Sequence, residues 1–407
     1  MVAKRAASPL RQSLSYVLQG LLVTAVLVVG KMGLEQTWLG AWFEQRTYAM
    51  LVKTLPQFRE KGQSVLVIDI SHLPGGTLSP DGRLAPTSRD ELRKLLDTLV
   101  MLQPRAVAID VDFSPDAVGW IAEQDPSFFD HCLRLSRSMP IVLGVHRTLR
   151  EPRAGWLGLP RYAPLAGALW LSGEGLERVP AWIAAPHVDE RMPSLGAALA
   201  HARHGERQGP LHHLQPWVHQ FRERTHVSPL HPDGLRIGDV LINYAGVGQL
   251  ISETVRVTQA RELVRHADRI QGRMVLLGVA DGASDLFHIP VLDRFQPGVF
   301  VHASTAFTLA SDPVYELNHP ARLALDFTVS LLALLVVVWT RRGKVEQNQQ
   351  ARAAAQARAL GGAVVGVLLV GFLVVYAARI FWLDFLLVIV FLLLHPALER
   401  RFHRVVH

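Results

Sequence analysis

Cysteine is almost missing from this 407-residue chain, in which Cys132 is the only one. A single thiol excludes an intramolecular disulfide and a cysteine-based zinc site. A domain of the size found here can bury enough apolar surface to do without either. We therefore expect a fold held together by its hydrophobic core.

The sequence also lacks the His-Glu-x-x-His pairing that marks one class of zinc enzyme. Histidine itself is frequent between residues 147 and 235, a stretch rich in Arg, His, Pro and Gly. For the histidines of the 201–231 insert, two interpretations are open. One is a metal-binding segment, and the other, which we favour, is a solvated elaboration of an arginine-rich protein. The histidines of the longer stretch are His187, His201, His204, His212, His213, His219, His226 and His231.

The formal net charge of +7 is weak support for a nucleic-acid partner. Part of the excess comes from basic residues that flank the hydrophobic segments near both ends of the chain. A domain outside the cytoplasm would meet no nucleic acid, so we expect no such partner.

Apolar residues make up 49% of the chain, and the mean hydropathy of +0.20 reflects their concentration in blocks. The first block follows three basic residues and resembles a signal sequence. No small-x-small cleavage site follows it, so we favour an uncleaved anchor over a cleaved signal peptide. Three blocks near the other end are each about long enough to cross the ~30 Å hydrocarbon core of a bilayer. The predicted transmembrane helices are residues 13–30, 323–340, 360–378 and 380–398.

Basic residues decide the predicted orientation, because cytoplasmic segments of membrane proteins carry an excess of Lys and Arg. The resulting cytoplasmic pieces are residues 1–12, 341–358 and 399–407. Residues 31–320 then lie outside, and the expected location is a bacterial inner membrane, spanned several times, with both termini in the cytoplasm and the lipid bilayer as a partner. The basic residues are Lys4, Arg5, Arg11, Arg341, Arg342, Lys344, Arg352, Arg358, Arg400, Arg401 and Arg404.

Between the first two predicted spans, short apolar runs bounded by turn residues are typical of strands buried on both faces of a parallel sheet. A helix capped by Ser88, with Glu91 as capping-box partner, and a second helix over residues 126–138 separate the first three runs. This β-α-β-α-β order predicts an α/β fold with a mainly parallel sheet. The predicted strands are residues 65–70, 106–113, 141–146 and 274–279, and further helices are predicted over residues 34–55, 259–270 and 303–310.

Several carboxylates fall at or just after the carboxyl ends of these strands. Open α/β sheets place ligands at that edge, so converging carboxylates there suit a cation or a cationic or hydroxylated ligand. The alternative is that they cap turns and helix N-termini. The candidate ligand-binding residues are Asp69, Ser71, Asp110, Asp112, Asp281 and Asp285. The sequence specifies no metal and no cofactor.

A set of short motifs, in a fixed order and followed directly by hydrophobic spans, carries a resemblance to a known family. The motifs are VLVIDIS at 65–71, AVAIDVDF at 106–113, LINY at 241–244, GRMVLLG at 272–278, DLFHIP at 285–290 and PGVFVHA at 297–303. Together they resemble the type 2 CHASE domain, the extracytoplasmic sensor of bacterial receptors, over most of residues 35–320. The resemblance implies an α/β extracytoplasmic sensor domain between one N-terminal and three C-terminal transmembrane helices.

The same carboxylates also support an alternative function, that of an enzyme. The segments DVD at 110–112 and DGASD at 281–285 also resemble the haloacid dehalogenase-like phosphohydrolases, which use such acids as nucleophile, general acid and Mg²⁺ ligands. Phe113 stands where that family has a small residue, and residues 95–343 hold no lysine to neutralise a phosphoryl intermediate. We therefore expect no enzyme activity and keep an extracytoplasmic phosphohydrolase as the alternative.

Proteins of the type 2 CHASE family usually continue into a cyclase, histidine kinase or similar output domain, whereas this chain stops nine residues beyond Leu398. None of its predicted cytoplasmic pieces approaches the ~40 residues below which a chain rarely folds unaided. We therefore expect a stand-alone sensor or binding protein whose output passes through a separate signalling or membrane protein. A homodimer and a purely structural membrane scaffold stay open, and neither ligand nor stimulus follows from the sequence.

The predicted spans carry polar and small residues of their own. The segment GAVVG at 362–366 permits close helix approach. Two acids lie near the outer ends of their spans, where we expect interfacial pairs of Asp326 with Arg322 and of Asp384 with Arg379.

Overall fold

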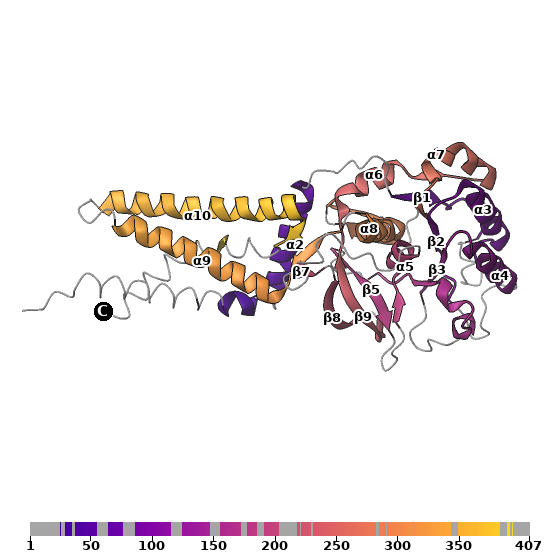
Figure 1. Ribbon diagram of the computed structural model, residues 1–407, viewed down its shortest axis with the longest axis horizontal. Coiled ribbons are helices and arrows are strands. Elements are labelled where there is room, and N and C mark those ends of the chain that lie inside the picture. Colours follow the sequence, from indigo (N-terminus) through magenta and orange to yellow (C-terminus); the bar gives the residue numbers. More distant parts are fainter. Residues whose placement is uncertain are drawn as a thin grey trace, which may run out of the picture. The chain divides into compact units, whose positions relative to one another are not determined.

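The chain folds into two compact units, seen in a computed structural model (Figure 1). The sheet unit comprises Pro56–His213 and Gln220–Val314, and the helical unit comprises Met1–Leu55, Leu214–His219 and Tyr315–His407. The structure describes residues 25, 29–34, 37–54, 64–75, 86–114, 124–146, 155–171, 177–184, 191–202, 218–219, 221–228, 231–281, 285–289, 291–311, 313–342, 349–382, 389–390 and 393.

The sheet unit is built on a six-stranded parallel sheet with the strand order β10-β1-β11-β2-β3-β4. Strand β11 lies at its centre, paired with β1 on one side and β2 on the other, so the last predicted strand joins the first two. The predicted α/β fold with a mainly parallel sheet is confirmed, and the four predicted strands end one to three residues earlier than expected. The strands are β1 (Val65–Asp69), β2 (Ala106–Asp110), β3 (Ile141–Val145), β4 (Ala166–Ala168), β10 (Val255–Arg256) and β11 (Met274–Gly278).

Helices cover both faces of this sheet, as Figure 1 shows for α3 and α4 on one side and α5 and α8 on the other. Successive side chains of one strand are therefore buried on opposite faces, as Leu66 and Val67 of β1 are. This double burial explains why the strands read as continuous apolar runs. The helices are α3 (Arg89–Leu102), α4 (Asp125–Ser136), α5 (Leu195–His201), α6 (Val247–Ser252), α7 (Ala267–Ile270), α8 (Gly298–Ala310) and the 3₁₀ helix η5 (Ala260–His266).

The predicted helix start at Ser88 is confirmed, but the predicted capping box is not formed, because the Ser88 N–H donates to the Pro74 carbonyl oxygen and the Glu91 carboxylate pairs with Lys94. The Ser88 hydroxyl oxygen accepts the backbone N–H of Glu91 at 3.4 Å, which satisfies one of the donors left open in the first turn of α3. At the other end, Gln103 adopts the left-handed conformation, with φ 53°, that ends many helices.

A second, antiparallel sheet with the order β6-β5-β9-β8 lies between Arg178 and Leu241, mostly within the stretch of residues 147–235 where the sequence indicated no regular element. The prediction failed there because the strands are rich in Arg, His and Pro and lack a clear alternation of apolar residues. A short hairpin, β12-β13, follows β11. The bounds are β5 (Arg178–Ala184), β6 (Arg191–Pro193), β8 (Phe221–Ser228), β9 (His231–Leu241), β12 (Leu286–Ile289) and β13 (Arg294–Pro297).

In its described residues, the helical unit contains three long helices and a three-stranded sheet of order β15-β14-β7. Strand β14 pairs parallel with β15 and antiparallel with β7, so it joins three segments that are far apart in sequence. The elements are α2 (Trp38–Thr54), β7 (Val218–His219), β14 (Tyr315–Leu317), α9 (His319–Arg342), α10 (Gln349–Ala378) and β15 (Ile380–Phe381).

The ion pair expected at the start of the second predicted span has different partners in the structure. Asp326 pairs with Lys31, whereas Arg322 lies 3.4 Å from a carboxylate oxygen of Glu44. Sequence separation hid these partners, since Lys31 and Glu44 belong to the N-terminal segment. Asp384 lies outside the described residues. Arg379 takes a positive φ of 53° directly after α10.

The described helices were compared with the requirements of a membrane span. Within the part of the chain that the structure describes, none is both long enough and apolar enough to cross a membrane. Helices α9 and α10 contain the predicted spans 323–340 and 360–378, whereas the predicted spans 13–30 and 380–398 lie largely outside the described residues. Residues 380–381, the predicted start of the fourth span, form strand β15 instead. A Cβ atom added at Gly362 or Gly366 would meet no atom within 4 Å, so the described chain makes no close helix contact there.

Candidate functional site

The candidate carboxylates lie at or after the carboxyl ends of three adjacent strands, β1, β11 and β2. Asp69 ends β1, Gly278 ends β11 and Asp110 ends β2, and these three residues are in register across the sheet. Asp112, Asp281 and Asp285 follow within a few residues. The carboxyl edge of the sheet is thus the place where the candidate residues gather, and their individual contacts decide what each can do.

Asp69 is a buried tie between neighbouring strands. Its Oδ1 accepts the backbone N–H of Ser71 at 3.0 Å and that of Ala280 at 3.1 Å. Its Oδ2 lies 3.7 Å from Nε of Arg256 on β10. A carboxylate that accepts from two strand-end loops and faces a guanidinium can hold the edge together, which is the role that the capping alternative gives to Asp69.

Two polar atoms at the end of β1 are buried and lack a hydrogen bond among the described residues: Oδ2 of Asp69 and the hydroxyl oxygen of Ser71. Buried polar atoms without partners are uncommon and call for an explanation such as an ion, a water or a ligand. These two atoms are therefore the part of the edge that can still form hydrogen bonds with a ligand.

Asp112 ties β2 to β3 in a similar way. Its Oδ1 accepts the backbone N–H of Ser114 at 2.9 Å and that of His146 at 3.2 Å, and it also accepts the Ser114 hydroxyl. Because these donors hold the carboxylate in place, Asp112 stabilises the loop after β2.

Asp110 and Asp285 form a carboxyl pair of unusual protonation. Burial and, to a smaller extent, the negative charge of Asp285 together raise the pKa of Asp110 to about 8. Burial also raises the pKa of Asp285, and the nearby His146 opposes that shift. Asp110 therefore holds its proton at neutral pH and presents a neutral carboxyl group that can donate a hydrogen bond.

Asp285 is fixed next to the start of α8. The backbone N–H of Gly298 donates to the Asp285 carbonyl oxygen at 3.0 Å. A Cβ atom added at Gly298 would lie 2.5 Å from Oδ2 of Asp285, closer than real Cβ contacts. Glycine at position 298 is what lets this carboxylate pack against the first residue of the helix.

Asp281 makes the weakest contact of the set. Its carboxylate lies 3.4 Å from the guanidinium of Arg256, and both side chains are about two-thirds exposed. Exposed pairs of this kind contribute little to stability because solvent screens them. The contact with Arg256 therefore constrains the Asp281 side chain only weakly.

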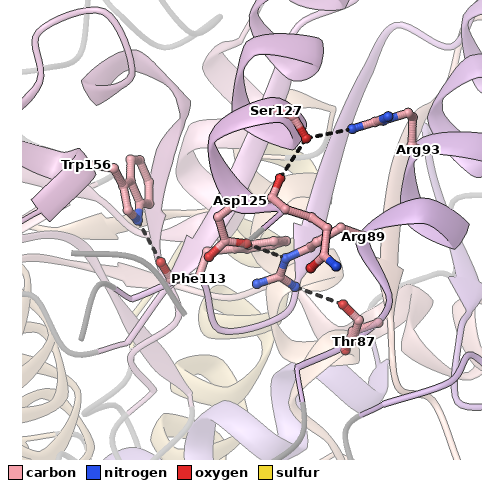
Figure 2. Close-up of polar contacts among 8 residues, drawn as sticks. Thr87, Arg89, Arg93, Phe113, Asp125, Ser127 and Trp156 are labelled. Atoms are coloured by element: carbon pink, nitrogen blue, oxygen red, sulfur yellow. Dashed lines mark hydrogen bonds and ion pairs between the residues drawn. The ribbon is translucent and has the colours of Figure 1, made fainter. Parts of the chain in front are cut away.

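A buried ion pair beside this edge, formed by Arg89 and Asp125, was not predicted from the sequence (Figure 2). Nε of Arg89 donates to Oδ1 of Asp125 at 2.6 Å, and Nη1 donates to the Thr87 carbonyl oxygen at 3.0 Å. The guanidinium also lies over the Phe113 ring, 4.4 Å from its centroid. These contacts join the first turns of α3 and α4 to the loop after β2.

Aromatic rings enclose the pair and keep water from it. The indole N–H of Trp156 donates to the Phe113 carbonyl oxygen at 2.7 Å, which fixes the loop after β2 from the far side (Figure 2). Phe113, Phe128 and Phe129 pack against one another with ring centroids about 6 Å apart. The only sequence signal was indirect: residues 125–126, Asp-Pro, suit a helix start.

Metal and thiol chemistry find little support in the described residues. They hold no group of three or more His, Cys, Asp or Glu side chains placed to bind a metal ion. Most of the 201–231 insert lies outside the part of the chain described in full, so its metal-binding interpretation stays a prediction. Cys132 is a buried residue of α4, and burial raises the pKa of its thiol well above the usual range.

The phosphohydrolase alternative fits this geometry poorly. A nucleophilic aspartate must be ionised, whereas the pKa of Asp110 is raised to about 8 by burial. A general acid must reach the substrate, whereas Oδ1 of Asp112 is held by the Ser114 and His146 donors. The arrangement is better suited to binding than to phosphoryl transfer.

A doubly covered parallel sheet with polar side chains tied together at its carboxyl edge defines an α/β domain of the open-sheet class, in which ligands bind at that edge. The family model described as "CHASE2 domain" matches residues 21–341, and the chain belongs to this family. The family consists of extracellular sensory domains, and the expected relationship to type 2 CHASE domains is confirmed. Comparison with curated proteins and with solved structures found no match.

Proposed function

We propose that this protein is a membrane-anchored extracytoplasmic sensor that binds a small ligand and relays its occupancy to a separate partner protein. In this proposal, residues 31–320 lie on the periplasmic side of a bacterial inner membrane and both termini lie in the cytoplasm. The observation that carries it is the family match over residues 21–341, because the family is one of extracellular sensory domains. The match also begins inside the first predicted span and ends just after the second.

The carboxyl edge supports the ligand-binding half of the proposal. Oδ2 of Asp69 and the Ser71 hydroxyl have hydrogen-bonding capacity left over among the described residues. Asp110, with its raised pKa of about 8, adds a neutral donor. Acceptors and neutral donors together suit a hydroxylated or cationic small molecule better than an anion.

Chain connectivity supports the relay half. Helix α8 begins against Asp285 at the candidate edge and ends at Ala310. The chain then runs directly through β14 into α9, which contains the second predicted span. A ligand that changes the position of α8 can therefore move β14 and α9. In this proposal, the resulting response is a shift of the first predicted span against the second.

Topology reporters test the membrane arrangement. A reporter fused after His407 should behave as cytoplasmic, and one inserted between Pro210 and Pro216 should behave as extracytoplasmic. Finding both on the same side would overturn the proposal. The fusion after His407 is also a control for expression, since it leaves the sheet unit unchanged.

A pull-down from detergent-solubilised membranes tests the relay. The proposal expects a kinase, a cyclase or another signalling or membrane protein to be captured with the full chain. Chemical crosslinking of the purified protein then shows whether a homodimer is the form that binds it. Capture of structural envelope proteins alone would favour the scaffold alternative.

A further inference from the structure

A buried polar cluster in the helical unit joins three segments that are distant in sequence. Lys31 lies in the N-terminal segment, Asp326 lies in the second turn of α9, and Trp382 directly follows β15. Nζ of Lys31 donates to Oδ2 of Asp326, and the indole N–H of Trp382 donates to Oδ1 of the same carboxylate at 3.2 Å. Both carboxylate oxygens of Asp326 are thus held, each by a different segment.

The cluster is closed to solvent. The side chains of Lys31 and Asp326 are 3% and 2% exposed, and Trp382 is fully buried. In a dry environment the attraction between opposite charges is much stronger than in water, so separating the two charges is costly. The ion pair is therefore stable when the two charges are in contact. A partly separated pair in the same dry environment is unfavourable, so we expect the contact to be either closed or fully open.

A second ion pair fastens the same helix to the N-terminal segment. Nη1 of Arg322, one turn before Asp326 on α9, lies 3.4 Å from Oε1 of Glu44 on α2. Tyr48 of α2 also packs against Phe381 of β15, with ring centroids 6.1 Å apart. The N-terminal segment thus contacts both α9 and β15 through polar and aromatic groups.

Strand β14, which begins directly after the last residue of the sheet unit, is connected to this cluster. Tyr315 of β14 is in register with Ile380 of β15, and its N–H donates to the Arg379 carbonyl oxygen at 3.0 Å. Glu316 of β14 is in register with Phe381. A displacement of β14 would therefore pull on β15 and on α9, the two segments that meet at Asp326.

We propose that the contact of Lys31 with Asp326 and Trp382 is a latch that holds the N-terminal segment against α9 in the resting state, and that signalling opens it. The inference rests on the proposed relay function, which requires the first span to shift against the second. The latch is the contact that such a shift must break, because Lys31 directly follows the first predicted span and Asp326 lies at the start of the second. When the latch opens, the charges of Lys31 and Asp326 separate. Either water then enters the cluster to solvate them, or β14 moves together with the displaced segment.

Distance measurements between spin labels on the full chain in detergent test the latch. Labels at G33C and T328C occupy exposed positions on the two joined segments, and buried Cys132 resists labelling. The wild-type background should give one narrow distance distribution. Lys31→Met, which keeps the apolar stem and removes the charge, should add a second, longer population.

Two variants serve as matched controls for this experiment. Lys31→Arg keeps the charge and should keep the single narrow distribution, and Lys53→Met removes an exposed lysine from α2 and should do the same. One narrow distribution in Lys31→Met would overturn the proposal, because the contact would then not hold the segments together.

Thermal unfolding separates a latch from a failure to fold. Lys31→Met and Asp326→Asn should each lower the midpoint by an amount on the order of 10 °C, and the double variant should lose less than the sum of the two. If the losses in the midpoint of the two single variants simply add in the double variant, Lys31 and Asp326 do not act as a pair and the proposal is wrong. These readouts concern the helical unit alone, so they can succeed even if the topology reporters contradict the membrane sensor.

Discussion

Nε of Arg89 lies 2.6 Å from Oδ1 of Asp125, and the two side chains are 1% and 3% exposed. This buried pair fastens the first turns of α3 and α4 to each other. Both turns lie at the carboxyl edge of the sheet, because each helix follows a parallel strand. The pair therefore supports the loops that surround the candidate ligand site.

Asp125→Asn should destabilise the full chain by about 3–5 kcal/mol, because the variant leaves the Arg89 cation buried without its countercharge. Chemical unfolding followed by circular dichroism measures the loss. Arg89→Met should cost a similar amount, because it removes the countercharge of the buried Asp125 carboxylate even though its apolar stem can still pack on the Phe113 and Phe128 rings. Lys94→Met removes an exposed partner of Glu91 on α3 and should leave the midpoint unchanged. Equal midpoints for Asp125→Asn and Lys94→Met would contradict the importance of the pair.

Gly298→Ala should disturb the candidate edge more than the helix that carries it. The new Cβ atom would lie 2.5 Å from Oδ2 of Asp285 and 3.0 Å from a ring carbon of Phe287, so the carboxylate must move. We expect a loss of about 1–2 kcal/mol in the free energy of unfolding. The control is Gly248→Ala in α6, where a Cβ atom meets nothing within 4 Å and alanine favours the helix. If both variants are neutral, Asp285 is not held against α8.

Asp110 should make the stability of the protein fall as the pH rises from about 4 toward 8. Its pKa is raised from 3.8 to about 8 in the folded state, so the folded state binds the proton more tightly than the unfolded state does. This contribution is complete below about pH 4 and is lost as the pH rises toward 8. The slope is at most about 1.4 kcal/mol per pH unit. Asp285, whose pKa is also raised, adds a change of the same sign.

His302 acts in the opposite direction at lower pH. Burial lowers its pKa from 6.5 to about 4, so its contribution is present above pH 6.5 and is lost as the pH falls toward 4. The effect of Asp110 is therefore best measured between pH 6.5 and 8, by denaturant unfolding of the wild type and of Asp110→Asn. The variant should show a flatter dependence than the wild type. Parallel curves over this window would mean that Asp110 is ionised at neutral pH.

The sequence predicted the parallel sheet well because its strands are buried on both faces, and such strands leave a plain apolar signal in the chain. The carboxylate positions followed from the same signal, since Asp69 and Asp110 directly end two of these runs. What each carboxylate contacts depended on partners far away in sequence, such as Ala280 for Asp69. Spacing along one segment carries no information about those partners.

The same reason explains the errors in the rest of the chain. Asp326 was paired with Arg322 because the two are one helical turn apart, whereas Lys31 comes from the other end of the sequence. The antiparallel sheet of β5, β6, β8 and β9 was missed because its strands are rich in Arg, His and Pro. Pairing between strands, rather than an apolar pattern, defines that sheet.

Asp69→Asn tests whether the edge is a binding site or only a tie between loops. An amide can still accept the N–H groups of Ser71 and Ala280, but it loses the charge that faces Arg256. If Asp69 serves only the loops, the variant should melt within a few degrees of the wild type, because asparagine is itself a good cap. If the left-over Oδ2 binds a cationic or hydroxylated ligand, the melting point of the wild type should rise with Ca²⁺, spermidine or a simple polyol, and that of the variant should not. Asp281→Asn, at the exposed mouth of the edge, is the matched control and should keep most of the wild-type shift. Identical shifts in all three proteins would place ligand binding away from Asp69.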